Sequence, residues 1–71
     1  MAGMRQIEVR GEGIRLGQLL KLADFVAAGS DVRPLLAEGV VTVGGRLETR
    51  RGRQLKKGDV VAVRGEQVRL V

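Results

Sequence analysis

A cluster of basic residues is the feature of this sequence that could do chemistry most directly. Six of the thirteen lysines and arginines in the 71-residue chain fall between positions 46 and 57, where Glu48 is the one acidic residue. That stretch carries a net charge of +5, equal to the net charge of the whole chain. Guanidinium groups make paired hydrogen bonds to phosphate and stack on exposed bases, and Gly52 lets the backbone turn sharply between two of them. The pattern predicts a binding surface for a polyanion, formed by Arg46, Arg50, Arg51, Arg53, Lys56 and Lys57.

Three further basic residues are weaker candidates for the same surface. Arg15 and Lys21 lie off the apolar stripe of a predicted first helix. Arg33 falls in the first turn of a predicted second helix, where free N–H groups and the positive end of the helix dipole also favour phosphate. Each of these, taken alone, is more often a surface charge than a ligand contact. A basic run can also be a solvated face, but the local concentration of arginine favours a binding surface.

Most catalytic and metal-binding side chains are missing from the sequence. The chain has no His, Cys, Tyr or Trp, which removes most general bases, nucleophiles and metal ligands. The eight carboxylates are scattered singly, and Ser30 has no histidine to activate it. The single aromatic residue, Phe25, lies at core-like spacing, which argues against a single-strand binder that works by stacking. We expect no enzymatic activity, no metal and no cofactor.

Two helices are predicted ahead of the basic cluster. Apolar residues from Leu16 to Ala27 recur at helical spacing and form one stripe over about three turns. Gly29 is predicted to end this helix, and Ser30 or Asp31 to cap the next one. The second helix is expected over residues 32–38, with Pro34 in its first turn and Gly39 after its end.

The remaining segments predict short strands. Residues 6–10 alternate polar and apolar side chains. Residues 40–43 and 46–48 flank Gly44 and Gly45, which is the signature of a hairpin with a type I′ turn. Strands are also expected over residues 60–64 and 67–71, with a turn at Gly65 and Glu66. The predicted class is α+β, with two short helices packed on a small, mostly antiparallel sheet.

Composition and length indicate one small domain. Residues 1–9 are polar and charged, and no apolar stretch is long enough for a secretory signal or a membrane span. The lack of cysteine fits a reducing compartment. We therefore expect a cytoplasmic domain over residues 1–71 that acts as a monomer.

Three motifs in this order resemble the S-four domain, the αL RNA-binding motif named after the fourth protein of the small ribosomal subunit. They are the Leu-Gly-Gln-Leu-Leu-Lys-Leu-Ala helix at residues 16–23, the Glu-x-Arg-Arg-Gly-Arg loop at 48–53 and the Lys-x-Gly-Asp-Val segment at 56–60. The match covers about residues 14–64. It is most similar to the small free-standing bacterial group of the YaaA and YbcJ type.

The resemblance implies that the second helix, the following hairpin and the loop form an RNA face. In this sequence, the residues that the resemblance implies for the RNA face are Arg33, Arg46, Arg50, Arg51, Arg53, Lys56 and Lys57. Two departures stand out. The second helix of many relatives is more basic, whereas here Asp31 and Glu38 flank Arg33, and the usual Val-Asn-Gly turn is Val43-Gly44-Gly45.

Two functional hypotheses of different classes follow. The first is a non-catalytic RNA-binding protein that recognises ribosomal RNA, a ribosomal subunit or tRNA through the basic loop and the second helix. The second is an adaptor whose basic loop docks an acidic protein partner of the translation machinery. Electrostatics leave duplex DNA open as a third ligand, although no long recognition helix is present. A membrane-surface role fits least, because the amphipathic helix carries few of the basic residues.

Overall fold

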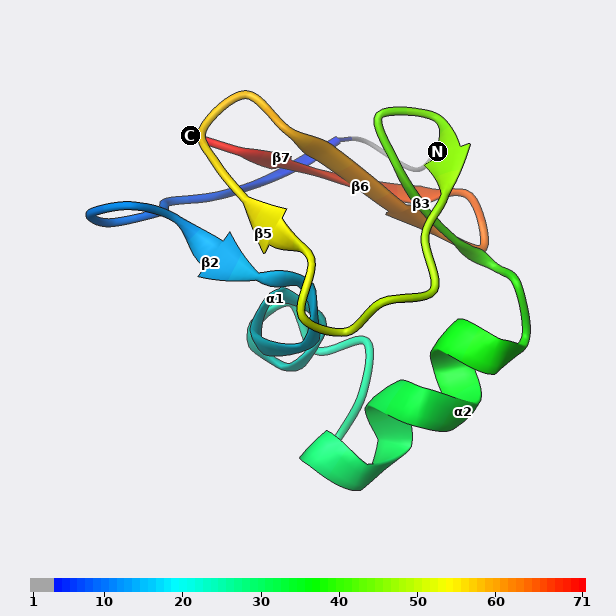
Figure 1. Cartoon of the computed structure of the whole chain (residues 1–71). Helices are drawn as coiled ribbons and strands as arrows, with labels where there is room; N and C mark the ends of the chain where they lie inside the picture. Colours follow the sequence, from blue (N-terminus) through cyan, green and yellow to red (C-terminus); the bar gives the residue numbers. More distant parts are fainter. Residues whose placement is uncertain (1–3) are drawn as a thin grey trace.

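The computed structural model describes residues 4–71, which form a small sheet with two helices on one side (Figure 1). A five-stranded sheet has the order β1-β7-β6-β3-β4, and a separate two-stranded sheet pairs β2 with β5. The α+β prediction, with two short helices on a mostly antiparallel sheet, is confirmed. The elements are β1 (Arg5–Ile7), β2 (Ile14–Arg15), α1 (Leu16–Leu22), the 3₁₀ turn η1 (Gly29–Asp31), α2 (Val32–Ala37), β3 (Val41–Val43), β4 (Arg46–Leu47), β5 (Gln54–Leu55), β6 (Val60–Val63) and β7 (Glu66–Leu70).

Alternating valines set the register of the sheet. Val61 lies opposite Val43 on one side and Val68 on the other, and all three side chains are buried. Because side chains alternate between the faces of a strand, this register turns one face of β3, β6 and β7 toward the helices. β1 joins the edge of β7 in parallel, an arrangement that the sequence pattern did not predict.

Both hairpin turns use left-handed backbone, one at the predicted position and one shifted. Gly44 and Gly45 have φ values of 60° and 83°, as a type I′ turn requires. The second turn falls at Arg64 and Gly65, one residue earlier than predicted, with φ values of 50° and 87°. Arg64 takes a conformation that L-residues disfavour. Its guanidinium donates to both carboxylate oxygens of Glu38 at 2.7 and 2.8 Å, which ties this turn to the end of α2.

Helix α1 is shorter than predicted. The apolar stripe indicated a helix reaching Ala27, but α1 ends at Leu22, and Asp24 adopts a left-handed φ of 67°. Arg5 Nη1 donates to the Ala23 carbonyl oxygen at 2.8 Å and so satisfies the C-terminal end of the helix. The predicted cap at Gly29 was wrong, since this residue begins η1 instead.

The core lies between the helices and the inner face of the sheet. Each helix supplies a leucine-rich face, and the strands supply valines and two leucines. Phe25 is half-buried against this core, as predicted, and the Arg5 guanidinium carbon lies 5.8 Å from its ring centroid. Fully burying one of these leucine or valine side chains contributes about 1.5–3 kcal/mol to the free energy of folding. The core thereby holds α1, α2 and the loop between β4 and β5 in fixed relative positions.

Candidate nucleic-acid interface

Glu48 organises the loop that carries the arginine cluster. This residue is 6% exposed and is the one charged residue among positions 4–71 that is buried. Its Oε2 accepts hydrogen bonds from the backbone N–H groups of Thr49 and Arg50 and from Arg50 Nε, each at 3.1 Å. Its Oε1 accepts from Arg53 Nη1 at 2.9 Å and from Arg50 Nη2 at 3.4 Å. One carboxylate thus fixes the backbone and two guanidinium groups of the loop.

The charges around Glu48 stabilise its ionised form. The hydrogen bond from the Arg50 side chain, then that from the Arg50 backbone, and the contact with Arg53 lower the pKa of Glu48 from 4.5 to about 2. The same contact raises the pKa of Arg50. Glu48 therefore keeps its negative charge at neutral pH and offsets one of the two neighbouring positive charges. Arg50 and Arg53 still reach solvent, with side chains 73% and 41% exposed.

The same loop caps the first helix through its backbone. The N–H groups of Leu16 and Gly17 donate to the carbonyl oxygens of Arg53 and Arg51, both at 2.8 Å. The β2–β5 pair lies directly beside this contact. The first N–H groups of α1 are consequently occupied by protein, and the loop is held against the start of the helix.

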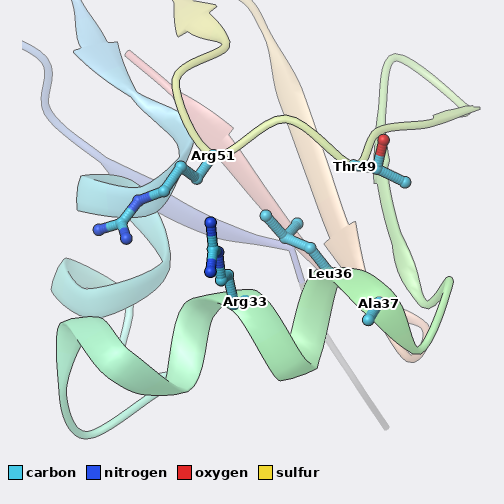
Figure 2. Close-up of a pocket in the computed structure, with 5 residues that line it drawn as sticks. All are labelled: Arg33, Leu36, Ala37, Thr49 and Arg51. Carbon is cyan, nitrogen blue, oxygen red and sulfur yellow. The ribbon is translucent and has the colours of Figure 1, made fainter.

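Arg51 lies between two hollows on the surface. Its Nε is 3.5 Å from the position that a Cβ on Gly17 would take, and its Nη2 is 3.9 Å from that on Gly29, so the side chain runs from the start of α1 toward η1. Figure 2 shows Arg33 rising from α2 toward the same space. The first hollow, of about 350 Å³, is lined by Arg33, Leu36, Ala37, Thr49 and Arg51. The second, of about 290 Å³, is lined by Arg15, Gly17, Gln18, Arg51 and Gly52.

Arg15, Arg33 and Arg51 form what we call the three-arginine face. Within residues 4–71, no carboxylate lies within ion-pair distance of these three guanidinium groups. The two acidic residues that flank α2 are engaged elsewhere, Asp31 with the N–H of Ala28 and Glu38 with Arg64. The face therefore keeps its full positive charge beside the two hollows.

The predicted contribution of free N–H groups at the start of the second helix was wrong. η1 runs straight into α2, so the N–H of Asp31 donates to Ala28 and that of Val32 to Gly29. No side-chain cap from Ser30 or Asp31 forms at the start of α2. Arg33 is exposed and lines the first hollow.

The structure places the other four candidate residues away from both hollows. Arg46 is exposed on the edge strand β4, opposite Val43. Lys56 and Lys57 are exposed in the turn before β6. The Gly58 N–H in this turn donates a hydrogen bond to the Leu70 carbonyl oxygen, so the turn lies beside the end of β7. Lys21 is exposed in the last turn of α1. The basic cluster of the sequence is thus divided between the loop at 48–53 and these outlying positions.

Sequence reasoning missed Glu48, Gln18 and Thr49. Glu48 had a visible signal, since it is a single carboxylate among six cations and belongs to the Glu-x-Arg-Arg-Gly-Arg motif. Gln18 accepts from the backbone N–H of Arg15 at 3.2 Å and lines the second hollow. Thr49 lines the first. Only the folded chain reveals the roles of the last two.

Within residues 4–71, no group of three potential metal ligands is present. None of the helices over the same residues has the length and apolar character needed to cross a membrane.

Comparisons with known proteins agree on one family. Residues 7–71 match the sequence profile described as the S4 domain. A Bacillus subtilis (strain 168) protein named "Probable ribosome maturation protein RlbA" is 44% identical over 59 residues, which cover 83% of each chain. The solution structure of YbcJ from E. coli has a TM-score of 0.74 at 30% identity and covers all of this chain and 91% of its own. The YbcJ structure is described as revealing an αL motif involved in RNA binding.

Proposed function

This chain belongs to the S4 domain family, and on that ground we propose that it binds structured RNA of the ribosome through the three-arginine face. The family resemblance inferred from the three sequence motifs is confirmed. Two similarities support the proposal: the B. subtilis relative is named for ribosome maturation, and the E. coli structure for RNA binding.

The observation that carries the proposal is the positive charge of the three-arginine face, which forms no ion pair with any carboxylate of residues 4–71. Arginines that pair with no carboxylate are free to donate to phosphate, and such charge-assisted bonds are roughly twice as strong as neutral ones. Arg50 and Arg53 extend the face along the loop, with Glu48 offsetting one of their charges. Lys21, Arg46, Lys56 and Lys57 act at most as peripheral contacts.

Salt dependence tests the proposal. Five arginines less one carboxylate leave about four effective charges, so log affinity should fall with log salt at a slope of about −3 to −4. We would titrate the protein by fluorescence anisotropy against a structured ribosomal RNA fragment and a DNA duplex of equal charge, at several salt concentrations. Tighter binding to the RNA with that slope supports the proposal. Equal, weak binding to both nucleic acids contradicts it.

An acidic protein partner would engage the same arginines, and one experiment separates the two ligands. Immobilised protein is incubated with ribosomal subunits before and after nuclease digestion of their RNA. RNA binding predicts that retention of the subunit proteins is lost after digestion. Retention that survives digestion contradicts the RNA proposal and favours a protein partner.

A further inference from the structure

The two hollows beside Arg51 differ in the chemistry of their linings. The first has an apolar floor, formed by Leu36 and Ala37 of α2, with Arg33 and Arg51 at one end and Thr49 further along (Figure 2). The second is lined by the side chains of Arg15 and Gln18 and by the backbone at two glycines. A surface that held only phosphates would have no use for the apolar floor.

An unstacked nucleobase matches the first hollow. A base has apolar faces and polar edges, and RNA-binding proteins commonly stack splayed-out bases on arginine planes. The volume of about 350 Å³ lies within the range of about 300–1,000 Å³ found for small-molecule sites. Arg33 offers a planar group, and Leu36 and Ala37 offer an apolar surface. Bases within a continuous duplex are covered by their neighbours and could not enter.

A phosphate matches the second hollow. Arg15 and Arg51 supply guanidinium donors there, and Gln18 adds an amide. Gly17 and Gly52 have no side chains that would narrow the opening of this hollow. Because Arg51 lines both hollows, a phosphate in one and the base of a nearby nucleotide in the other would contact the same guanidinium group.

We propose that the three-arginine face captures an unpaired nucleotide, with its base on Leu36 and Ala37 beside Arg33 and a neighbouring phosphate between Arg15 and Arg51. This inference rests on the proposed RNA binding and specifies its ligand. The RNA that fits is a helix interrupted by a bulged or extrahelical nucleotide.

Three RNA hairpins of one sequence test the inference. The first is fully paired, the second carries a single bulged 2-aminopurine, and the third carries an abasic residue at the same bulge. The last two have equal charge, so their comparison isolates the base. We expect the 2-aminopurine RNA to bind about fivefold more tightly or better than the abasic RNA, with a change in 2-aminopurine fluorescence. Equal affinities and unchanged fluorescence overturn this inference alone, whereas no binding to any hairpin at low salt overturns the proposed function itself.

Substitutions locate the base. Ala37→Leu fills the first hollow with a good helix former at an exposed position, so the fold should persist. We expect this variant to bring the ratio of the two bulge affinities close to one. Ala27→Leu adds the same side chain at an exposed position outside both hollows and should keep the wild-type ratio. A wild-type ratio in Ala37→Leu places the base elsewhere and overturns the assignment.

A second variant keeps the test informative if Ala37→Leu folds poorly. Arg33→Lys retains the positive charge but removes the planar stacking surface. We expect the ratio of the bulge affinities to fall in this variant, with circular dichroism verifying the fold. An unchanged ratio in folded Arg33→Lys shows that Arg33 does not stack on the base and contradicts the inference.

Discussion

Glu48 has a positioning role that its charge alone would not suggest. A carboxylate repels phosphate, yet this one accepts five hydrogen bonds from its own loop. A buried carboxylate is stable only when its oxygens are satisfied in this way. We infer that the loop at residues 48–53 takes its shape from Glu48, which directs Arg50 and Arg53 outward and places the Arg51 backbone against α1.

Glu48→Gln separates positioning from electrostatics. The change raises the net charge from +5 to +6 (thirteen basic minus seven acidic residues), so electrostatics alone would strengthen RNA binding. We expect weaker binding instead, because the amide cannot hold both guanidinium groups and the two backbone N–H groups. Anisotropy titrations on the folded variant measure the change. Tighter binding by Glu48→Gln would show that Glu48 only opposes the ligand.

Acid should remove the contribution of Glu48 to stability. Its pKa is about 2 in the folded protein against an ordinary value of 4.5. A lowered carboxyl pKa stabilises the fold fully above pH 4.5, and this stabilisation is lost as the pH falls from about 4.5 to about 2. Urea unfolding at pH 6 and pH 2.5 measures it, with Glu48→Gln as the matched control. We expect the stability gap between the two proteins to shrink at pH 2.5, and a gap independent of pH would contradict the ion pairs.

The position of a basic residue should matter more than its charge. Arg33→Ala and Lys57→Ala each remove one positive charge from an exposed residue, but only Arg33 lines a hollow. We expect about tenfold weaker RNA binding for Arg33→Ala, from the lost charge-assisted contacts, and about twofold for Lys57→Ala. Alanine suits the helix at position 33, so folding should persist. Equal losses of RNA affinity in the two variants would mean that binding depends only on net charge.

At the scale of elements, local signals predicted the parts of the fold that depend on local chemistry. Pro34 lies in the first turn of α2, Gly39 follows the end of this helix, and Gly44 with Gly45 forms the first hairpin turn, because each of these residues restricts or permits particular backbone angles. The length of α1 was overestimated because the apolar spacing continues to Val26, which is buried from the loop after Asp24 has left the helix. Val26 is therefore buried without being helical.

Elements held by distant contacts left no such signal. β2 and β5 have two residues each, too few for any periodicity, and they pair across about forty positions of sequence. The parallel pairing of β1 with β7 likewise joins the two ends of the described chain. The β2–β5 pairing holds the loop at residues 48–53 against the start of α1. The sequence pattern predicted the loop but not this packing.

Gly13 is the residue that permits the β2–β5 contact. It has a φ of 117°, and an added Cβ would overlap the carbonyl oxygen of Leu55. We expect Gly13→Ala to lower the free energy of unfolding by about 3 kcal/mol. Gly11→Ala is the matched control, because Gly11 also has a positive φ, of 64°, but open space around it, and should cost about 1–2 kcal/mol. Urea denaturation compares the two, and equal losses would show that only the backbone angle matters.

At the scale of the whole molecule, folding redistributes the charge that the sequence concentrates. The segment at residues 46–57 has a net charge equal to that of the whole chain. In the folded protein, however, Arg46 lies on an edge strand, and Lys56 and Lys57 lie in a turn beside the end of β7. The fold brings Arg15 and Arg33 from other elements to the sides of Arg51. Local patterns made Arg15 and Arg33 weaker candidates for the same surface. They could not place these residues beside Arg51, because Arg15 lies at the end of β2 and Arg33 in α2, and the packing of these elements depends on contacts between distant segments.

Backbone amide NMR shifts, recorded while the protein is titrated with a ribosomal RNA fragment, would show whether structured RNA binds at the three-arginine face. We predict that the largest shift changes fall on residues lining the two hollows, among them Gln18, Arg33, Ala37 and Arg51, while the turn at residues 56–59 changes little. If the largest changes fall in that turn and on β4, and the amides around the hollows do not shift, RNA does not bind at the three-arginine face.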